Sequence, residues 1–425
     1  MDTQAVFFII IIVLMVVSGC TKAIFLQRTS MWFMWILFAI ICYGFATGFV
    51  ISLNAVSHVA LRPIRALLTL IGCYSVLILI ARIKKQNLIT LPIDKYIFFS
   101  IAAHSLIMIA EFISPPFRDA IYTYTVSLER VVGARLYYSM AGLSNGGGAQ
   151  ISVYQSIGVL LLPLLLAKTT TLKSKVFISL CGVASFISVL ISGRSGVVGI
   201  FIFYPVVLFL IDKDELFLKK ALSNAIFGGF VLAFALFVLI WDSNAFFKYE
   251  SSEGFEAVKI RSIELARGED TTVELLLDDH ILFPDDIETF FWGNPRLFES
   301  DQNDSYRILN SDIGYVRVLF GYGLFGSFLH YLFYGGVIKL SFSVYKKQSP
   351  FRNFAAFSIV VAIVILFFNC KEVFVFTRVG FSIVGLSIFA LACQNKHLKR
   401  YHYSLTEVSR ESVLPPSASV RPRVN

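Results

Sequence analysis

Long apolar stretches separated by short polar connections organise this sequence. A membrane-spanning α-helix needs about 20 apolar residues, and eleven stretches approach that length. They are residues 5–20, 31–53, 66–81, 96–113, 151–167, 176–192, 197–211, 225–241, 313–337, 354–369 and 373–393. Apolar and polar positions do not alternate within them, so helices, not a β-barrel, would satisfy the backbone in lipid. The pattern predicts an all-α polytopic membrane domain over residues 1–400, with about 11–12 transmembrane helices.

The polar connections predict which side of the membrane each stretch faces. Lysine and arginine gather in alternate connections, as cytoplasmic loops do, and this places the N-terminus outside. It also places both long connections, 114–150 and 242–312, outside as periplasmic loops. The second spans 71 residues and holds 17 of the 28 acidic residues. A loop of this length usually covers or builds a site.

Composition agrees with a membrane protein. The chain of 425 residues is 56% hydrophobic and 15% charged, whereas soluble domains carry about 25% charged residues. The net charge of +9 is explained by the basic cytoplasmic connections, so no nucleic-acid partner is inferred. The six cysteines have no paired spacing, which excludes a disulfide framework or a zinc site; no cofactor or metal is expected. The polar tail 401–425 is predicted to be disordered and cytoplasmic.

Cations on the outward side are the candidate functional residues. Arg194 lies in a four-residue link between two apolar stretches, flanked by Gly193 and Gly196. Glycines there permit a tight turn and let a ligand approach the backbone. Arg135 lies in the first outward loop, ahead of a glycine-rich run that includes Gly146. The alternative for Arg194 is an anchor to lipid headgroups. The alternative for Arg135 is an amphipathic segment on the membrane surface, with the glycines as a flexible lead-in.

A third group opens the ninth stretch, with Arg307, Ser311, Asp312 and Arg317. Ser311 or Asp312 has the position of a helix N-cap. Arg317 falls one to two turns into an apolar helix, where a charge usually faces a protein-lined cavity and indicates function. Arginines that converge on one membrane surface would suit a diphosphate, because the planar guanidinium binds phosphate oxygens through two hydrogen bonds.

Candidate general bases are fewer. Asp312 is favoured by its position at the membrane boundary, and His280 in the long loop is a second possibility, although a lone loop histidine is more often plain surface. His104 and Glu111 lie seven residues apart on one face of the fourth stretch. We expect these two to form hydrogen bonds within the helix bundle.

The motifs resemble those of one enzyme family. The pattern D-x-G-Y-x-R-x5-G-x2-G at the ninth stretch resembles the segment after the large periplasmic loop in O-antigen polymerases of the Wzy type. Its residues are Asp312, Gly314, Tyr315, Arg317, Gly323 and Gly326. The sequence ISGRSG at 191–196 is similar to an arginine motif shared with O-antigen ligases. Arg135 with Gly146 and Arg307 with Gly323 match the R-x10-G and R-x15-G spacings of that family's periplasmic loops.

The resemblance implies a metal-independent glycosyltransferase of the C type (GT-C) in the bacterial inner membrane, with its active site facing the periplasm. Its partners would be an undecaprenyl-diphosphate-linked oligosaccharide, membrane lipid and a chain-length regulator. Arg135, Arg194, Arg307 and Arg317 would bind the diphosphates, and Asp312 would act as the base. An O-antigen ligase and a flippase or transporter of lipid-linked sugars are the alternatives. Ligases tend to have a histidine within 311–317, where this chain has none.

Overall fold

The computed structural model describes residues 9–14, 16, 28–51, 53–86, 88–125, 142–144, 148–210, 282–298, 313–347, 351–377 and 380–395. Within these ranges six helices are long and apolar enough to cross a membrane. They are α3 (Arg28–Ile51), α4 (Leu53–Ile83), α5 (Ile93–Ile113), α7 (Gly148–Lys168), α8 (Leu172–Ser192) and α14 (Gly314–Tyr345). The prediction of an all-helical polytopic membrane protein is therefore confirmed. The expected stretch 225–241 and most of 5–20 lie outside the described residues, as does the tail 401–425.

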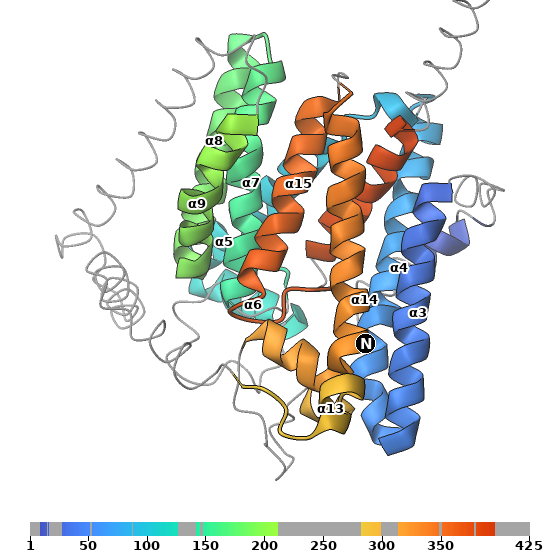
Figure 1. Cartoon of the computed structure of the whole chain (residues 1–425). Helices are drawn as coiled ribbons and strands as arrows, with labels where there is room; N and C mark the ends of the chain where they lie inside the picture. Colours follow the sequence, from blue (N-terminus) through green and yellow to red (C-terminus); the bar gives the residue numbers. More distant parts are fainter. Residues whose placement is uncertain are drawn as a thin grey trace, which may run out of the picture.

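The described helices form one bundle. Shorter apolar helices complete it: α9 (Arg194–Leu210), α15 (Arg352–Phe368) and a last helix, Gly380–Asn395. Figure 1 shows α5, α7, α8 and α9 on one side, α3, α4 and α14 on the other, and α15 between them. Every residue of α7 from Ile151 to Leu166 is buried, and 89% of its span is buried, as expected for a helix that is largely apolar on all its faces.

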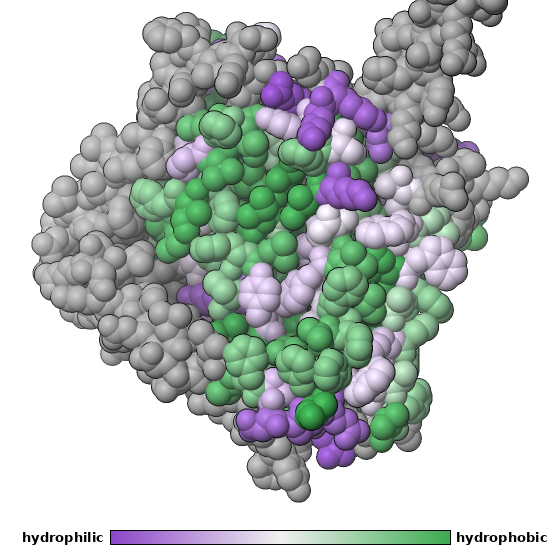
Figure 2. All heavy atoms as spheres, in the orientation of Figure 1, coloured by the Kyte–Doolittle hydropathy of each residue, from purple (hydrophilic) through white to green (hydrophobic). Residues whose placement is uncertain are grey.

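An apolar belt covers the outside of the bundle. Figure 2 shows hydrophobic side chains across this face, with hydrophilic side chains gathered at its two ends. Large apolar side chains such as Phe38, Phe209 and Phe328 are exposed there. Such a surface is costly in water but neutral against lipid tails, so the belt marks the part of the bundle that the bilayer surrounds.

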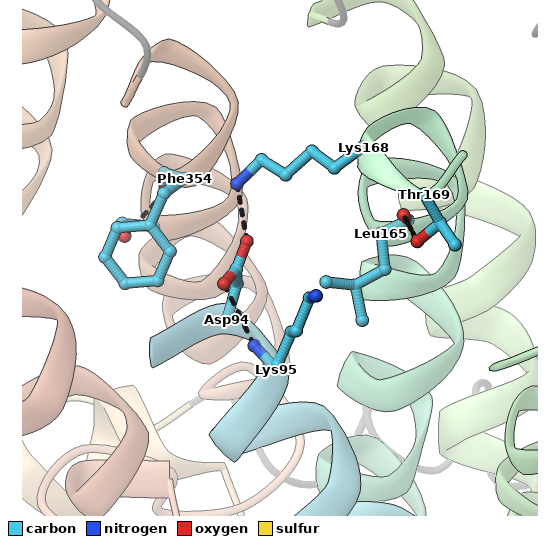
Figure 3. Close-up of polar contacts among 7 residues, drawn as sticks. Asp94, Lys95, Leu165, Lys168, Thr169 and Phe354 are labelled. Carbon is cyan, nitrogen blue, oxygen red and sulfur yellow. Dashed lines mark hydrogen bonds and ion pairs between the residues drawn. The ribbon is translucent and has the colours of Figure 1, made fainter. Parts of the chain in front are cut away.

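Three of the basic connections lie at the same end of the bundle, which we call the basic end. There the Lys168 Nζ atom lies 2.5 Å from the Asp94 Oδ2 atom, an ion pair that joins the end of α7 to the start of α5 (Figure 3). The Asp94 Oδ1 atom accepts a hydrogen bond from the Lys95 backbone N–H. An acid at a helix N-terminus and a base at a C-terminus both interact favourably with the helix dipoles. At the same end the Tyr345 hydroxyl donates to the Leu210 carbonyl of α9.

Helix α4 is longer than the apolar stretch 66–81 predicts. It begins at Leu53 and continues through Pro63. The added residues include Arg62, whose guanidinium lies 5.1 Å from the centre of the Phe298 ring. A cation stacked on an aromatic face can stay within a packed helix, which is why this polar start of α4 does not end the helix.

Helix α14 begins later than expected and bends. Its N-cap is Ile313, with no side-chain cap, so the predicted cap at Ser311 or Asp312 is wrong. The carbonyl of Asn369 instead accepts the Tyr315 backbone N–H at 3.1 Å, which satisfies a donor that a cap would serve. At Gly323 the backbone leaves the helical conformation (φ 62°) and the helix kinks. The 22 residues after the kink span about 33 Å, close to the thickness of a bilayer core.

The eleventh predicted stretch, 373–393, also begins differently. Residues 369–377 form a non-helical segment, and the last helix begins at Gly380. Side chains satisfy the backbone of this segment. The Asn369 Oδ1 atom accepts the N–H groups of Phe374 and Val375, and the Tyr334 hydroxyl accepts the Phe376 N–H. Non-helical backbone is tolerated at membrane depth only when protein satisfies it in this way.

Candidate functional site

The predicted site residues divide into two groups. Gly193, Gly196, Gly314, Arg317 and Gly323 lie within the described residues, as does the backbone of Arg194. The others fall outside the described residues. They are Arg135, Gly146, His280, Arg307 and Asp312. The geometry below therefore concerns the turn at 193–196 and the first part of α14, which lie at the end of the bundle opposite the basic end.

The turn at 193–196 is packed against the first turns of α7. The Gly196 N–H donates to the Ser152 Oγ atom at 2.9 Å, and the Ser152 hydroxyl donates to the Gly193 carbonyl. A Cβ atom on Gly196 would lie 2.3 Å from the Ser152 carbonyl oxygen. Only a glycine lets α9 approach α7 this closely. The position of Arg194 on the bundle is thus set by backbone contacts on both sides of it.

A lysine from elsewhere in the sequence reaches this turn. The Lys371 Nζ atom donates to the Ser195 Oγ atom at 3.0 Å. Lys371 lies in the corner that follows α15, and Gln150 of α7 donates from its side chain to the Val373 carbonyl of the same corner. The corner at 369–373 therefore places a second cationic residue beside Arg194.

The same corner holds the start of α14. The Tyr315 N–H donates to the Asn369 carbonyl, and the Tyr315 hydroxyl donates to the Leu366 carbonyl at 2.7 Å. A Cβ atom on Gly314 would lie 2.4 Å from the Glu372 carbonyl oxygen. Arg317 follows in the first turn of α14 and is partly exposed. Arg317 is the fourth residue of α14, about one turn into the helix, and lies six residues before the bend at Gly323.

The turn at 193–196 and the start of α14 are more than a hundred residues apart in the sequence. Both nevertheless contact the corner at 369–373. Lys371 contacts the turn at 193–196, and Asn369 contacts the first turn of α14. Among the described residues this brings Arg317, Lys371 and the backbone of Arg194 to one end of the bundle. Arginine and lysine side chains are the groups that bind phosphate oxygens through charge-assisted hydrogen bonds.

The non-helical segment behind the corner is buried and strained. Phe376 has a φ of 56° and is only 3% exposed. A bulky residue at positive φ is a rare conformation that the surrounding structure must impose. The rings of Phe333, Tyr334 and Phe381 pack around it, and the Tyr334 hydroxyl holds its N–H. These contacts make the corner a rigid support for the residues it carries.

His104 and Glu111 take part in a second arrangement at this end of the bundle. The Glu111 Oε2 atom accepts the Gly142 N–H at 3.0 Å, and the His104 Nε2 atom accepts the Leu143 N–H at 3.1 Å. His104 also contacts the side-chain amide of Gln155 in α7. The expectation that both residues form hydrogen bonds within the bundle is confirmed. They fix the chain just before α7 begins.

Acidic and metal-binding chemistry is sparse in the part of the chain that the structure describes. No group of three or more histidine, cysteine, aspartate or glutamate side chains there could hold a metal ion. Burial raises the pKa of the Cys370 thiol, which lies in the corner, so this cysteine is a poor nucleophile at neutral pH. The described side chains of the corner include one cation, Lys371, with Glu372 next to it, and the Asn369 amide, which accepts backbone N–H groups.

Sequence reasoning missed Lys371. The residue lies in the short outward link between the tenth and eleventh predicted stretches, and the argument applied to Arg194 would have identified it. Ser152 and Asn369 carried no such signal. Their importance comes from backbone groups that reach them from distant parts of the chain.

The chain was compared with protein families, curated proteins and solved structures. No family model, no curated protein and no solved structure matches the chain. The chain is a helical membrane protein in which Lys371 contacts the turn at 193–196.

Proposed function

We propose that the chain is a polysaccharide polymerase of the O-antigen type, with a GT-C-like fold in the bacterial inner membrane. It would transfer a growing glycan from undecaprenyl diphosphate to a lipid-linked repeat unit at the periplasmic face. One observation carries the proposal. The corner at 369–373 joins the arginine turn at 193–196 to the arginine-bearing start of α14, the two motifs that resemble this family.

The proposed chemistry assigns a role to each cation. A hydroxyl oxygen of the acceptor sugar forms a bond to the anomeric carbon of the donor, and the bond from that carbon to the diphosphate oxygen breaks. The hydroxyl proton passes to Asp312, and the diphosphate leaves with the bonding electron pair. Arg194 and Arg317 offset the charge that develops on it, which is electrostatic transition-state stabilisation without a required metal. Arg135 and Arg307 would bind the diphosphates from the outward loops.

The loop 242–312 would cover the site and select the sugar. A chain-length regulator would be a protein partner, and the polyprenyl chains would lie in the surrounding lipid. The glycines at 146, 193, 196, 314 and 323 would serve as structural residues. His280 is kept as the second candidate for the base.

Deletion of the gene tests the proposal through the lipopolysaccharide pattern on a gel. Loss of the ladder with a single-repeat band retained supports a polymerase. Loss of both, with lipid-linked polymer accumulating, would indicate an O-antigen ligase, and loss of both without it a flippase. An unchanged ladder would refute all three.

Replacement of Arg194 by lysine tests the role of the turn. We expect Arg194→Lys to retain little polymer synthesis although the charge is kept, because lysine cannot form the paired hydrogen bonds of a guanidinium. The matched control is Arg82→Lys, at an exposed position of the basic end, which should leave the ladder unchanged. A normal ladder in Arg194→Lys at wild-type protein level would remove Arg194 from the mechanism.

A further inference from the structure

Residues 282–298 belong to the long polar loop, yet they pack against the membrane helices. This segment contains α13 (Ile287–Trp292) and a short 3-10 turn, Pro295–Leu297. The Asn294 N–H donates to the Phe320 carbonyl at 2.6 Å. Gly293 lies against the kink of α14, where a Cβ atom would meet the Gly323 nitrogen at 2.4 Å. The segment is therefore held firmly at the bend of α14 (Figure 1).

The positions of these contacts along the helices show where the segment lies relative to the ends of the membrane spans. The Tyr43 hydroxyl of α3 donates to the Trp292 carbonyl at 2.9 Å. Tyr43 lies seven residues before the end of the candidate span Thr29–Val50, or about 10 Å inside that end at 1.5 Å per residue. Phe298, which is 2% exposed, stacks under Arg62 near the start of the span Val59–Ile83. The segment thus lies beside the ends of the spans and not beyond them.

Its outer face carries large apolar side chains without protein cover. Phe283 is 68% exposed, Ile287 is 77% exposed and Trp292 is 54% exposed. This apolar face is continuous with the lipid-facing belt, because the Trp292 ring lies 5.2 Å from the ring of Phe325, itself an exposed residue of α14. Exposed aromatic and aliphatic groups beside a lipid-facing belt are typical of a segment at a membrane interface.

Exposed acidic groups lie beside these apolar side chains. Asp286 caps α13 by accepting the Thr289 N–H, and this hydrogen bond lowers the pKa of the Asp286 carboxyl. Asp285 and Glu288 are also exposed. A charged carboxylate is expensive in hydrocarbon, so these groups must remain in the headgroup layer or in water.

We propose that segment 282–298 is an interfacial membrane anchor, with Phe283, Ile287 and Trp292 inserted among the lipid chains of the leaflet at the end opposite the basic end. The bilayer then holds segment 282–298 at the kink of α14. Since the segment binds that kink through Asn294 and Gly293, lipid contact is transmitted to the short part of α14 that carries Arg317. The inference concerns lipid and does not depend on the proposed enzyme activity.

Tryptophan fluorescence in vesicles tests the proposal. Trp32, Trp35 and Trp241 would be replaced by phenylalanine, so that Trp292 is the only remaining tryptophan of four. The full-length protein would be reconstituted in phosphatidylcholine vesicles with bromine at a shallow or a deep position of the acyl chain. We expect Trp292 to be quenched more strongly by the shallow bromine than by the deep one, and to be protected from aqueous iodide.

A matched pair of variants gives the control. In a background without tryptophan, Ile287→Trp should be quenched by brominated lipid, whereas Asp285→Trp, at an exposed acidic position ahead of α13, should be quenched by iodide. Elution as a single peak on size exclusion would verify that each variant is folded. Efficient iodide quenching of Trp292 and of Ile287→Trp, without lipid quenching, would overturn the proposal. Protection from both quenchers would also overturn it, because it would mean that protein covers this face.

Discussion

Gly196 offers the most direct test of how the arginine turn is built. In Gly196→Ala the new Cβ atom would lie 2.3 Å from the Ser152 carbonyl oxygen and 2.4 Å from its Oγ atom. Ordinary contacts are 3.4–4 Å, so α9 and α7 would have to separate by roughly 1 Å. Overpacking of this kind costs about 1–3 kcal/mol. Loss of the hydrogen bond from Gly196 to Ser152 adds about 1 kcal/mol.

We therefore expect Gly196→Ala to lower the free energy of unfolding by about 2–4 kcal/mol. The assay is denaturant-induced unfolding in mixed detergent micelles, followed by tryptophan fluorescence. Gly335→Ala is the matched control: it lies within α14, and a Cβ atom there would meet nothing within 4 Å. Alanine favours a helix over glycine by about 1 kcal/mol, so the control should be neutral or stabilising. Equal stability of the two variants would refute the close packing of the 193–196 turn on α7.

Three further outcomes are expected. Lys168→Met should destabilise the protein by about 2–3 kcal/mol, because it leaves Asp94, whose side chain is 10% exposed, without its cation. The double variant Asp94→Leu, Lys168→Met should recover most of this loss in the same unfolding assay. Lys371→Met should shorten or abolish the polymer ladder. The control Lys173→Met, at an exposed position of the basic end, should leave the ladder unchanged. A normal ladder in both variants would contradict a role for Lys371 in the site. Gly142→Ala should lower stability by about 2 kcal/mol, because Gly142 has a φ of 59° and little free space; unchanged unfolding would argue against this conformation.

The membrane helices were the most predictable part of the fold. A run of apolar residues long enough to cross a bilayer has few alternatives to a helix, which is why the stretches 151–167 and 176–192 correspond closely to α7 and α8. The boundaries that failed share one cause. The start of α14 donates a backbone hydrogen bond to Asn369, and the segment 369–377 donates backbone hydrogen bonds to the side chains of Asn369 and Tyr334. The local sequence gives no indication of such partners.

In the candidate site, too, the sequence indicates individual residues but not the contacts between them. Arg194 and Arg317 could be selected from the sequence because cations are unusual at outward boundaries of a membrane protein. That the turn at 193–196 and the first turn of α14 both contact the corner after α15 could not be predicted, because these contacts pass through Lys371 and Asn369. The sequence also assigned the whole of 242–312 to a polar loop. Its average polarity conceals the apolar face of 282–298, which only packing against α3, α4 and α14 makes evident.

Sequence alone determined that this protein is a helical membrane protein and that its basic connections alternate along the chain, because hydrophobic length and charge are local properties. Tertiary structure decided where the helices bend, which turns meet, and which part of the polar loop returns to the bundle. Those outcomes depend on close approach at Gly196, Gly293 and Gly323 and on hydrogen bonds from side chains to distant backbone groups. Such contacts exist only once the helices have packed.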